Sequence, residues 1–161
     1  MAAVIHISLS QQRLLLRDDE QILMAAAVST AANGSGERYG SECTPRGLHR
    51  IRAKIGAGCT VNTVFRGRRP TGEIYHPDLA SQFPDRDWIL TRILWLCGME
   101  PGKNRLGDVD TMRRYIYIHG TPDETALGRP GSHGCIRMAN ADIVRLFDLV
   151  SIGTRVRISE E

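Results

Sequence analysis

Residues 116–120 read Ile-Tyr-Ile-His-Gly, and residues 131–137 read Gly-Ser-His-Gly-Cys-Ile-Arg. The first stretch is rich in β-branched and aromatic residues, which is typical of a strand that ends at His119. A cysteine needs its thiolate form to act as a nucleophile, and a nearby imidazole is able to take the proton. The connecting loop holds two prolines and two glycines and is expected to bring Cys135 back beside His119. The sequence therefore predicts Cys135 as a nucleophile with His119 as its base.

The neighbours of this pair supply the other expected parts of a site. The backbone carbonyl of Gly120 is the expected partner for the second ring nitrogen of the base, since no acidic side chain is obvious nearby. Glycine at position 134 allows close approach of the backbone, and N–H groups around Gly134 and Cys135 are expected to stabilise an oxyanion. Arg137 carries a permanent charge that suits bidentate binding of a substrate carboxylate.

Each of these residues also has a purely structural interpretation. A single buried cysteine is usually a packing residue, and a histidine at a strand end is usually only hydrogen-bonded. A metal site of His119, His133 and Cys135 is a further alternative, but it lacks a fourth ligand and the usual zinc spacing. The other cysteines carry no evident chemistry and are expected to be free thiols: Cys43, Cys59 and Cys97.

The composition is that of a soluble globular protein. The chain has 161 residues, of which 42% are hydrophobic and 24% charged, and we expect one domain over residues 1–161. The formal net charge of +3 is too small and too scattered for a nucleic-acid surface. Arg66, Arg68 and Arg69 form the densest basic cluster, which we interpret as a solvated loop.

No apolar run is long enough to predict a membrane span. The N-terminus lacks a basic stretch, and His6 and Ser8 interrupt its apolar residues, so no secretory leader is visible. Together with Met1, this predicts a cytoplasmic protein. The alternative is a periplasmic protein whose leader has been removed.

The pattern along the chain predicts a mainly antiparallel β domain with one late helix. Strands are expected near residues 5–9, 13–17, 21–30, 49–55, 60–65, 88–96, 114–119 and 156–158. Ala25 to Ala27 would suit a helix equally well. Residues 66–87 are expected to form a long irregular insertion, acting as a lid or a cleft wall. The helix is expected from Asn140, as its N-cap, to Val150.

The motif resembles the signature of the L,D-transpeptidase catalytic domain family, also called YkuD-like, in which His-Gly is followed by a loop and Ser-His-Gly-Cys-Ile-Arg. The matching residues are His119-Gly120 and Ser132-His133-Gly134-Cys135-Ile136-Arg137. The likeness extends to Thr44-Pro45-Arg46-Gly47, Gly128, the helix at 140–150 and Gly153-Thr154-Arg155-Val156. It covers most of the chain, and residues 56–110 are the least typical part.

The resemblance implies a β-sandwich with a cleft, a catalytic capping loop and one or more short helices. It implies that Cys135 is the nucleophile, His119 the general base and Arg137 the group that binds the substrate's carboxylate, without metal or cofactor. Gly120 would contribute its carbonyl. Ser132, His133 and Gly134 would support the loop and the oxyanion. The substrate would be a peptidoglycan tetrapeptide or muropeptide, cleaved between meso-diaminopimelate and the terminal D-alanine, and carbapenems would acylate the same cysteine.

The acyl group would then pass to an amine, which makes a cross-link, or to water, which trims the stem. Cross-linking members of the family work outside the cytoplasmic membrane and usually carry an export signal or anchor, and none is visible here. We therefore expect an L,D-carboxypeptidase of murein recycling. The alternatives are a periplasmic L,D-transpeptidase and a non-catalytic muropeptide-binding domain.

Overall fold

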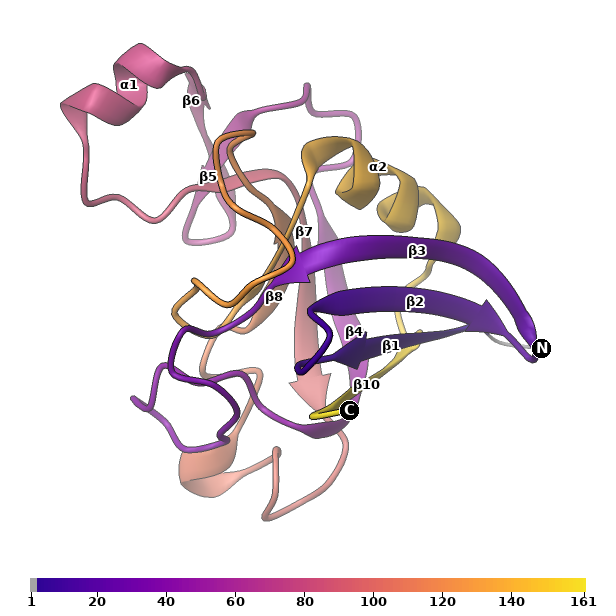
Figure 1. The fold of residues 1–161 in the computed structure, drawn as a ribbon. Coiled ribbons are helices and arrows are strands. Elements are labelled where there is room, and N and C mark those ends of the chain that lie inside the picture. Colours follow the sequence, from indigo (N-terminus) through magenta and orange to yellow (C-terminus); the bar gives the residue numbers. More distant parts are fainter. Residues whose placement is uncertain (1–2) are drawn as a thin grey trace.

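The computed structural model describes residues 3–161, which form a mainly antiparallel β-sheet with two α-helices (Figure 1). The strands are β1 (Val4–Ser8), β2 (Arg13–Asp18), β3 (Gln21–Ser29), β4 (Gly47–Ile55), β5 (Thr63–Arg66), β6 (Arg69–Ile74), β7 (Ile89–Gly98), β8 (Tyr117–Gly120), β9 (Ile136–Met138) and β10 (Arg155–Ser159). The helices are α1 (Pro77–Gln82) and α2 (Asn140–Leu149), and a short 3-10 helix covers Gly107–Val109. The predicted mainly β fold is confirmed.

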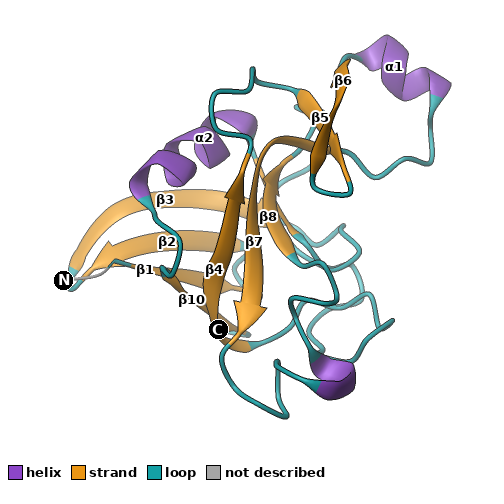
Figure 2. Cartoon of the chain, turned by 180° about the vertical axis from the view of Figure 1, so that it is seen from behind, coloured by secondary structure: helices purple, strands orange, loops and turns teal. Residues whose placement is uncertain are grey.

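The sheet closes on itself because β4 has a neighbour on each side. The strand order is β4-β10-β1-β2-β3-β9-β8-β7-β5-β6, and β4 also pairs with β7. Figure 2 shows β4 and β7 side by side, with β1, β2 and β3 curving round the opposite wall. The layers of the expected sandwich are therefore opposite walls of one closed sheet, which leaves few free strand edges.

The interior is filled by the inward-facing side chains of the strands and by one face of α2. Ile143, Leu146 and Phe147 of this helix join the main core cluster. Fully burying an aliphatic side chain of this size contributes roughly 1.5–3 kcal/mol. The apolar residues whose spacing predicted the helix are thus the residues that pack against the barrel core.

The helix alternative for residues 25–27 is wrong, because β3 is a regular strand. Met24, Ala26 and Val28 point inward, whereas Ala25 and Ala27 are exposed. β3 pairs with β2 along most of its length, with Leu16 opposite Met24. Alternating burial, and not helix propensity, decides this segment.

The irregular insertion expected at residues 66–87 is also wrong in part. It contains β6, which pairs with β5 as a hairpin, and the short helix α1. Pro77 begins α1, and the ring nitrogen of His76 caps it by accepting from the N–H of Leu79 at 3.3 Å. The hairpin and α1 project from the body of the barrel in Figure 1.

Asn140 is not the N-cap of α2. Ala139 precedes the helix and provides no side-chain cap. The side chain of Asn140 is instead buried, where it accepts from Oγ1 of Thr91 in β7 at 2.6 Å and donates to Oδ1 of Asn62, just before β5, at 3.0 Å. A long-range polar contact has replaced the local one that the sequence predicted.

The structure offers little on the cellular location that the sequence predicts. Met1, on which that expectation partly rests, lies outside the described residues. Within residues 3–161, no helix combines the length and apolar character that crossing a bilayer requires.

Candidate active site

His119 lies in β8 and is completely buried. Its Nδ1 is 2.6 Å from the carbonyl oxygen of Gly120, the contact predicted from the sequence. A carbonyl can only accept, so Nδ1 carries the ring proton and Nε2 holds a free lone pair. Burial lowers the pKa of His119 from its usual value, which keeps the ring neutral. Within residues 3–161, Nε2 has no hydrogen-bond partner, so it is free to act as a base.

Gly120 is held where no other residue fits. A Cβ at this position would lie 2.5 Å from the carbonyl oxygen of Leu90 and would also meet the side chain of Asn140. The carbonyl that orients His119 therefore depends on close approach of β7 and α2 to the end of β8.

Cys135 immediately precedes β9 and keeps part of its surface exposed. Its Sγ accepts from the backbone N–H of Tyr117 and donates to the carbonyl oxygen of Tyr115, both at 3.3 Å. Burial raises the pKa of Cys135 to about 12, and the N–H of Tyr117 opposes that shift. The resting nucleophile is therefore a neutral thiol beside a neutral imidazole.

Sheet register places the two groups on one face. The first row across the strands is Trp95, Tyr117 and Cys135, and the second is Ile93, His119 and Arg137. Side chains two residues apart share a face, and diagonal neighbours across a strand pair lie roughly 7–8 Å apart at the backbone, within reach of one another. No hydrogen bond joins Cys135 to His119 in the described part of the chain, because the thiol points to Tyr115 instead.

The parallel pairing of β8 with β9 is what brings the pair together. Ile118 lies opposite Ile136, and His119 opposite Arg137. A parallel neighbour needs a long connection, and residues 121–135 provide it. The loop that was expected to return Cys135 to His119 does so through this register.

Ser132 closes the turn that carries Cys135. Its Oγ donates to the carbonyl oxygen of Cys135 at 2.6 Å and accepts from the N–H of Gly134 at 3.2 Å. The carbonyl of Thr30 receives the N–H groups of Gly131 and Ser132, at 2.8 and 2.9 Å. The N–H of Gly134 is thus already engaged, and the prediction of an oxyanion donor rests on the N–H of Cys135.

Thr44 fixes the other side of the same turn. Its buried Oγ1 donates to the carbonyl oxygen of Gly134 at 2.9 Å and accepts from the N–H of Ala31 at 3.0 Å. Gly134 has φ +133°, and a Cβ there would lie 3.1 Å from Ile116 Cδ1 and 3.3 Å from the carbonyl oxygen of Cys43. Both the backbone conformation and the lack of space therefore require glycine.

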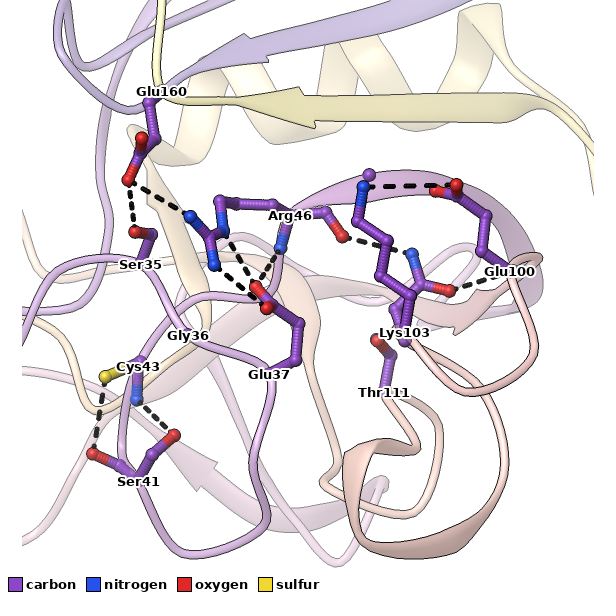
Figure 3. Close-up of polar contacts among 12 residues, drawn as sticks. Ser35, Gly36, Glu37, Ser41, Cys43, Arg46, Glu100, Lys103, Thr111 and Glu160 are labelled. Atoms are coloured by element: carbon purple, nitrogen blue, oxygen red, sulfur yellow. Dashed lines mark hydrogen bonds and ion pairs between the residues drawn. The ribbon is translucent and has the colours of Figure 1, made fainter.

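Side-chain contacts of Arg46 stabilise the turn that carries Thr44, as Figure 3 shows. Arg46 donates to both carboxylate oxygens of Glu37 at 3.0 Å and reaches Glu160 at 3.4 Å. Glu160 also accepts from Ser35 Oγ at 2.5 Å. The Thr-Pro-x-Gly turn is thereby tied to the end of β10 as well as to the loop that bears Cys135.

Arg137 is already paired. Its guanidinium donates to Asp87 Oδ1 and to the carbonyl oxygen of Gly131, both at 3.1 Å. Asp87 was not identified from the sequence, because it lies 50 positions from Arg137 in the segment expected to be irregular, and no local pattern marks it. Binding of a substrate carboxylate by Arg137 stays a prediction, and it requires competition with Asp87.

The profile of the L,D-transpeptidase catalytic domain family (YkuD) matches residues 2–158 of this chain. The chain belongs to that family. The putative L,D-transpeptidase YqjB of Bacillus subtilis is 48% identical over 48 residues, which are 30% of this chain and 27% of that protein. The probable L,D-transpeptidase YbiS of Escherichia coli is 46% identical over 48 residues, 30% of this chain and 16% of that protein. The match thus spans about a quarter or less of these relatives.

Solved structures of the same family share the fold. The L,D-transpeptidase of Xylanimonas cellulosilytica superposes with a TM-score of 0.56 at 21% identity and covers 98% of this chain and 60% of its own. The catalytic domain of the Enterococcus faecium L,D-transpeptidase, acylated by ertapenem, gives a TM-score of 0.56 at 16% identity and covers 98% and 97%. At these identities the likeness establishes the fold, including the predicted sandwich.

Two pockets flank His133 in this L,D-transpeptidase-family domain. One, of about 240 Å³, is lined by residues that include Asp85, Asp87 and Arg137. The other, of about 210 Å³, is lined by residues that include Arg113, Arg114 and Tyr115. His133 itself is exposed, 3.5 Å from Glu42, so the structure places it between the pockets and not among the hydrogen bonds of the loop.

The structure does not bring His119, His133 and Cys135 together as the metal-site alternative requires. Within residues 3–161, no group of three His, Cys, Asp or Glu side chains is arranged to hold a metal ion. His119 Nδ1 contacts the carbonyl oxygen of Gly120, and Cys135 Sγ contacts that of Tyr115.

Proposed function

We propose that this domain is an enzyme that transfers an acyl group from a peptidoglycan stem peptide through a thioester on Cys135. The observation that carries the proposal is the pairing of β8 with β9, which sets a neutral thiol diagonally from a neutral imidazole with a free Nε2. The bond attacked is the one between meso-diaminopimelate and the terminal D-alanine, as the family resemblance implies.

The geometry suggests a sequence of proton movements. Rotation of the Cys135 side chain away from the carbonyl of Tyr115 turns its S–H toward Nε2 of His119. As Sγ attacks the substrate carbonyl, the proton passes to Nε2, so no free thiolate has to persist in the buried site. The N–H of Cys135 donates to the developing oxyanion.

The second half returns the enzyme to its starting state. The protonated His119 gives its proton to the amine of D-alanine as the C–N bond breaks, which leaves a thioester on Cys135. An acceptor then attacks the thioester, and His119 takes the acceptor's proton. When the thiol leaves, Sγ regains a proton from His119, and all atoms and charges balance.

We propose water as the main acceptor. The pocket beside Arg137 has a volume of about 240 Å³, which is below the roughly 300–1,000 Å³ of pockets that enclose drug-sized ligands. It has room for a departing amino acid and water, whereas a second stem peptide would lie mostly outside it. This supports an L,D-carboxypeptidase, and muropeptide recycling in the cytoplasm is the cellular setting that we propose with it.

Transpeptidation is the second candidate, and one feature favours it. Asp85 lines the same pocket, is exposed and forms no ion pair within residues 3–161. A free carboxylate there would attract the ammonium group of an amine acceptor. The two candidates therefore differ in whether Asp85 has a partner during the reaction.

Product analysis separates the candidates. The protein is incubated with a disaccharide-tetrapeptide, with and without an excess of a second stem, and the products are identified by mass. Tripeptide and free D-alanine in both mixtures support hydrolysis, whereas predominant dimer in the second mixture contradicts it. Export of the native full-length protein, measured by fractionation, would contradict the cytoplasmic setting.

A covalent adduct separates an enzyme from a binding domain. We expect a carbapenem to add its mass to the wild-type protein and to leave Cys135→Ala unmodified. If Cys135 fails to react with both carbapenem and stem peptide at neutral pH, a non-catalytic muropeptide-binding domain becomes the better interpretation.

A further inference from the structure

The turn between β5 and β6 carries an arginine in a conformation that arginine rarely adopts. Arg66 pairs with Arg69, so Gly67 and Arg68 form a two-residue turn, with φ +54° and +65°. Turns of this kind favour glycine or asparagine at both positions. A strained arginine at the second position indicates that its side chain is needed where the turn places it.

The guanidinium of Arg68 is held over an aromatic cluster next to Cys135. It lies 4.8 Å from the ring centre of Trp95 and 4.6 Å from that of Tyr115, and it donates to the hydroxyl of Tyr117 at 3.0 Å. Trp95 and Tyr117 belong to the same apolar cluster as the nucleophile. Trp95 and Tyr117 share its row on the sheet, and Tyr115 accepts its thiol hydrogen. The solvated loop expected at residues 66–69 therefore sends one side chain into the site.

In the described part of the chain, Arg68 has neither a carboxylate partner, as Arg137 does, nor a set of backbone acceptors, as Arg114 does. Arg137 is paired with Asp87, and Arg114 donates to the carbonyl oxygens of Gly36 and Cys43. Within residues 3–161, no carboxylate lies within ion-pair distance of Arg68. Its single hydrogen bond goes to a neutral hydroxyl, so most of its five N–H donors are free.

From this arrangement we propose that Arg68, stacked on Trp95 and Tyr115, forms a carboxylate subsite for the side chain of the residue whose carbonyl Cys135 attacks. This rests on the proposed function, in which that residue is diaminopimelate, a diamino diacid. Its side chain ends in a carboxylate that plain lysine stems lack. The aromatic rings cover the methylenes, and the guanidinium binds the terminal oxygens in bidentate fashion.

The spacing fits this ligand. Trp95 and Cys135 are separated by two strand spacings, roughly 10 Å across the sheet. β8, which carries Tyr117, lies between β7 and β9, and the guanidinium donates to the hydroxyl of Tyr117 at 3.0 Å. In extended diaminopimelate six bonds separate the attacked carbonyl carbon from the side-chain carboxylate carbon, a reach of roughly 7.5 Å. A carboxylate at its end therefore comes within reach of Arg68 while the carbonyl stays at Sγ.

The test measures binding separately from chemistry. Two stem tetrapeptides are compared, one with free diaminopimelate and one with its side-chain carboxylate amidated. Binding is measured by calorimetry in the Cys135→Ala background, with Arg68, with Arg68→Met and with Arg69→Gln. Arg68→Met keeps an apolar stem over the rings and removes the charge, whereas Arg69 is an exposed neighbour and serves as the matched control.

We expect the Arg68 protein and the Arg69→Gln control to prefer the free-acid stem by about 10- to 100-fold, the usual effect of a charge-assisted hydrogen-bond pair. Arg68→Met should lose that preference by weakening binding of the free acid alone, and Arg68→Lys should restore part of it. Equal weakening for both stems would show a structural role and overturn the subsite. If discrimination is present but the wild-type protein releases no D-alanine, the proposed function fails and the subsite stands.

Discussion

The loop that carries Cys135 and the segment that projects beside it are held in opposite ways. Residues 128–138 are tied to the barrel by buried hydrogen bonds, most of them to backbone atoms, such as those from Thr44 and Ser132. β5 pairs with β7 in the sheet, and the rest of the projecting segment, residues 67–88, reaches the barrel through exposed or half-buried side-chain pairs, such as Tyr75 with Glu124 and Asp87 with Arg137. Buried backbone contacts hold atoms to within a fraction of an ångström, whereas exposed pairs are individually weak.

The difference separates two tasks. The nucleophile and its base are placed by the sheet and leave little freedom, as bond-making chemistry requires. The projecting segment adds charged groups, Arg68 and Asp87, around that fixed centre. Changes in the loop should therefore abolish reaction or folding, and changes in the segment should shift specificity or pH dependence.

The largest effect is expected for His119→Gln, which removes the base but keeps a polar side chain of similar size. The rate of D-alanine release should fall by about 10³-fold or more, because the neutral thiol loses its proton acceptor. Mass spectrometry of released D-alanine measures it. Retention of more than a tenth of the wild-type rate would show that His119 is not the base, and alkylation of Cys135 at high pH verifies that the site is intact.

Thr44→Val tests the attachment of the loop. It leaves the N–H of Ala31 and the carbonyl of Gly134 buried without their partner, which costs about 2 kcal/mol or more of unfolding free energy. Urea denaturation measures the loss, and the release of D-alanine should fall with it. Thr71→Val, in the projecting segment, removes an exposed hydroxyl and should change stability by less than about 0.5 kcal/mol. Equal effects of the two variants would contradict the contrast.

Asp87→Asn tests the charge that the segment brings to the site. Burial is the main reason that the pKa of Cys135 is raised, and the Asp87 carboxylate adds to that rise. For His119 burial lowers the pKa, and Asp87 opposes that shift. Removing a negative charge makes the thiolate easier to form, so the pKa of Cys135 should fall. The pH profile of alkylation by iodoacetamide should move to lower pH by roughly half a unit to one unit. An alkaline shift would refute this, and Asp85→Asn, which neutralises an exposed neighbour, is the control.

The smallest effect is expected for Glu42→Gln. Both side chains of its contact with His133 are exposed, so stability should change by less than about 0.5 kcal/mol. The rate of D-alanine release should stay within about twofold of wild type. A larger loss of rate would mean that His133 has a part in the loop after all, as the family resemblance implies.

The same contrast explains what the sequence predicts and what it does not. Local alternation of apolar and polar residues predicts the strands, and apolar spacing predicts the buried face of α2. The predicted strands that the structure contains include β1, β2, β4, β7 and β10. Cys135, His119 and the Gly120 carbonyl were predicted because they lie in two short motifs. The register of the parallel pair β8–β9 then places the two motifs next to each other.

The unpredicted parts depend on partners far away in the chain. Asp87 and Arg137 are separated by 50 positions, and Arg68 and Tyr117 by 49. α1 has no buried residue, so it leaves no apolar periodicity to detect. Asn140 is an acceptable cap by type, but its side chain forms stronger long-range contacts with Thr91 and Asn62. Local rules fail where tertiary contacts outweigh them.

The high pKa of Cys135 has a consequence for the lifetime of the enzyme. Peroxide and similar oxidants attack thiolates, and they convert exposed, acidic cysteines to sulfenic acid and beyond. A thiol whose pKa burial raises to about 12 presents almost no thiolate at neutral pH. Burial of Cys135 therefore protects it in a second way, because we expect the low thiolate fraction of the idle protein to slow oxidation of the sulfur.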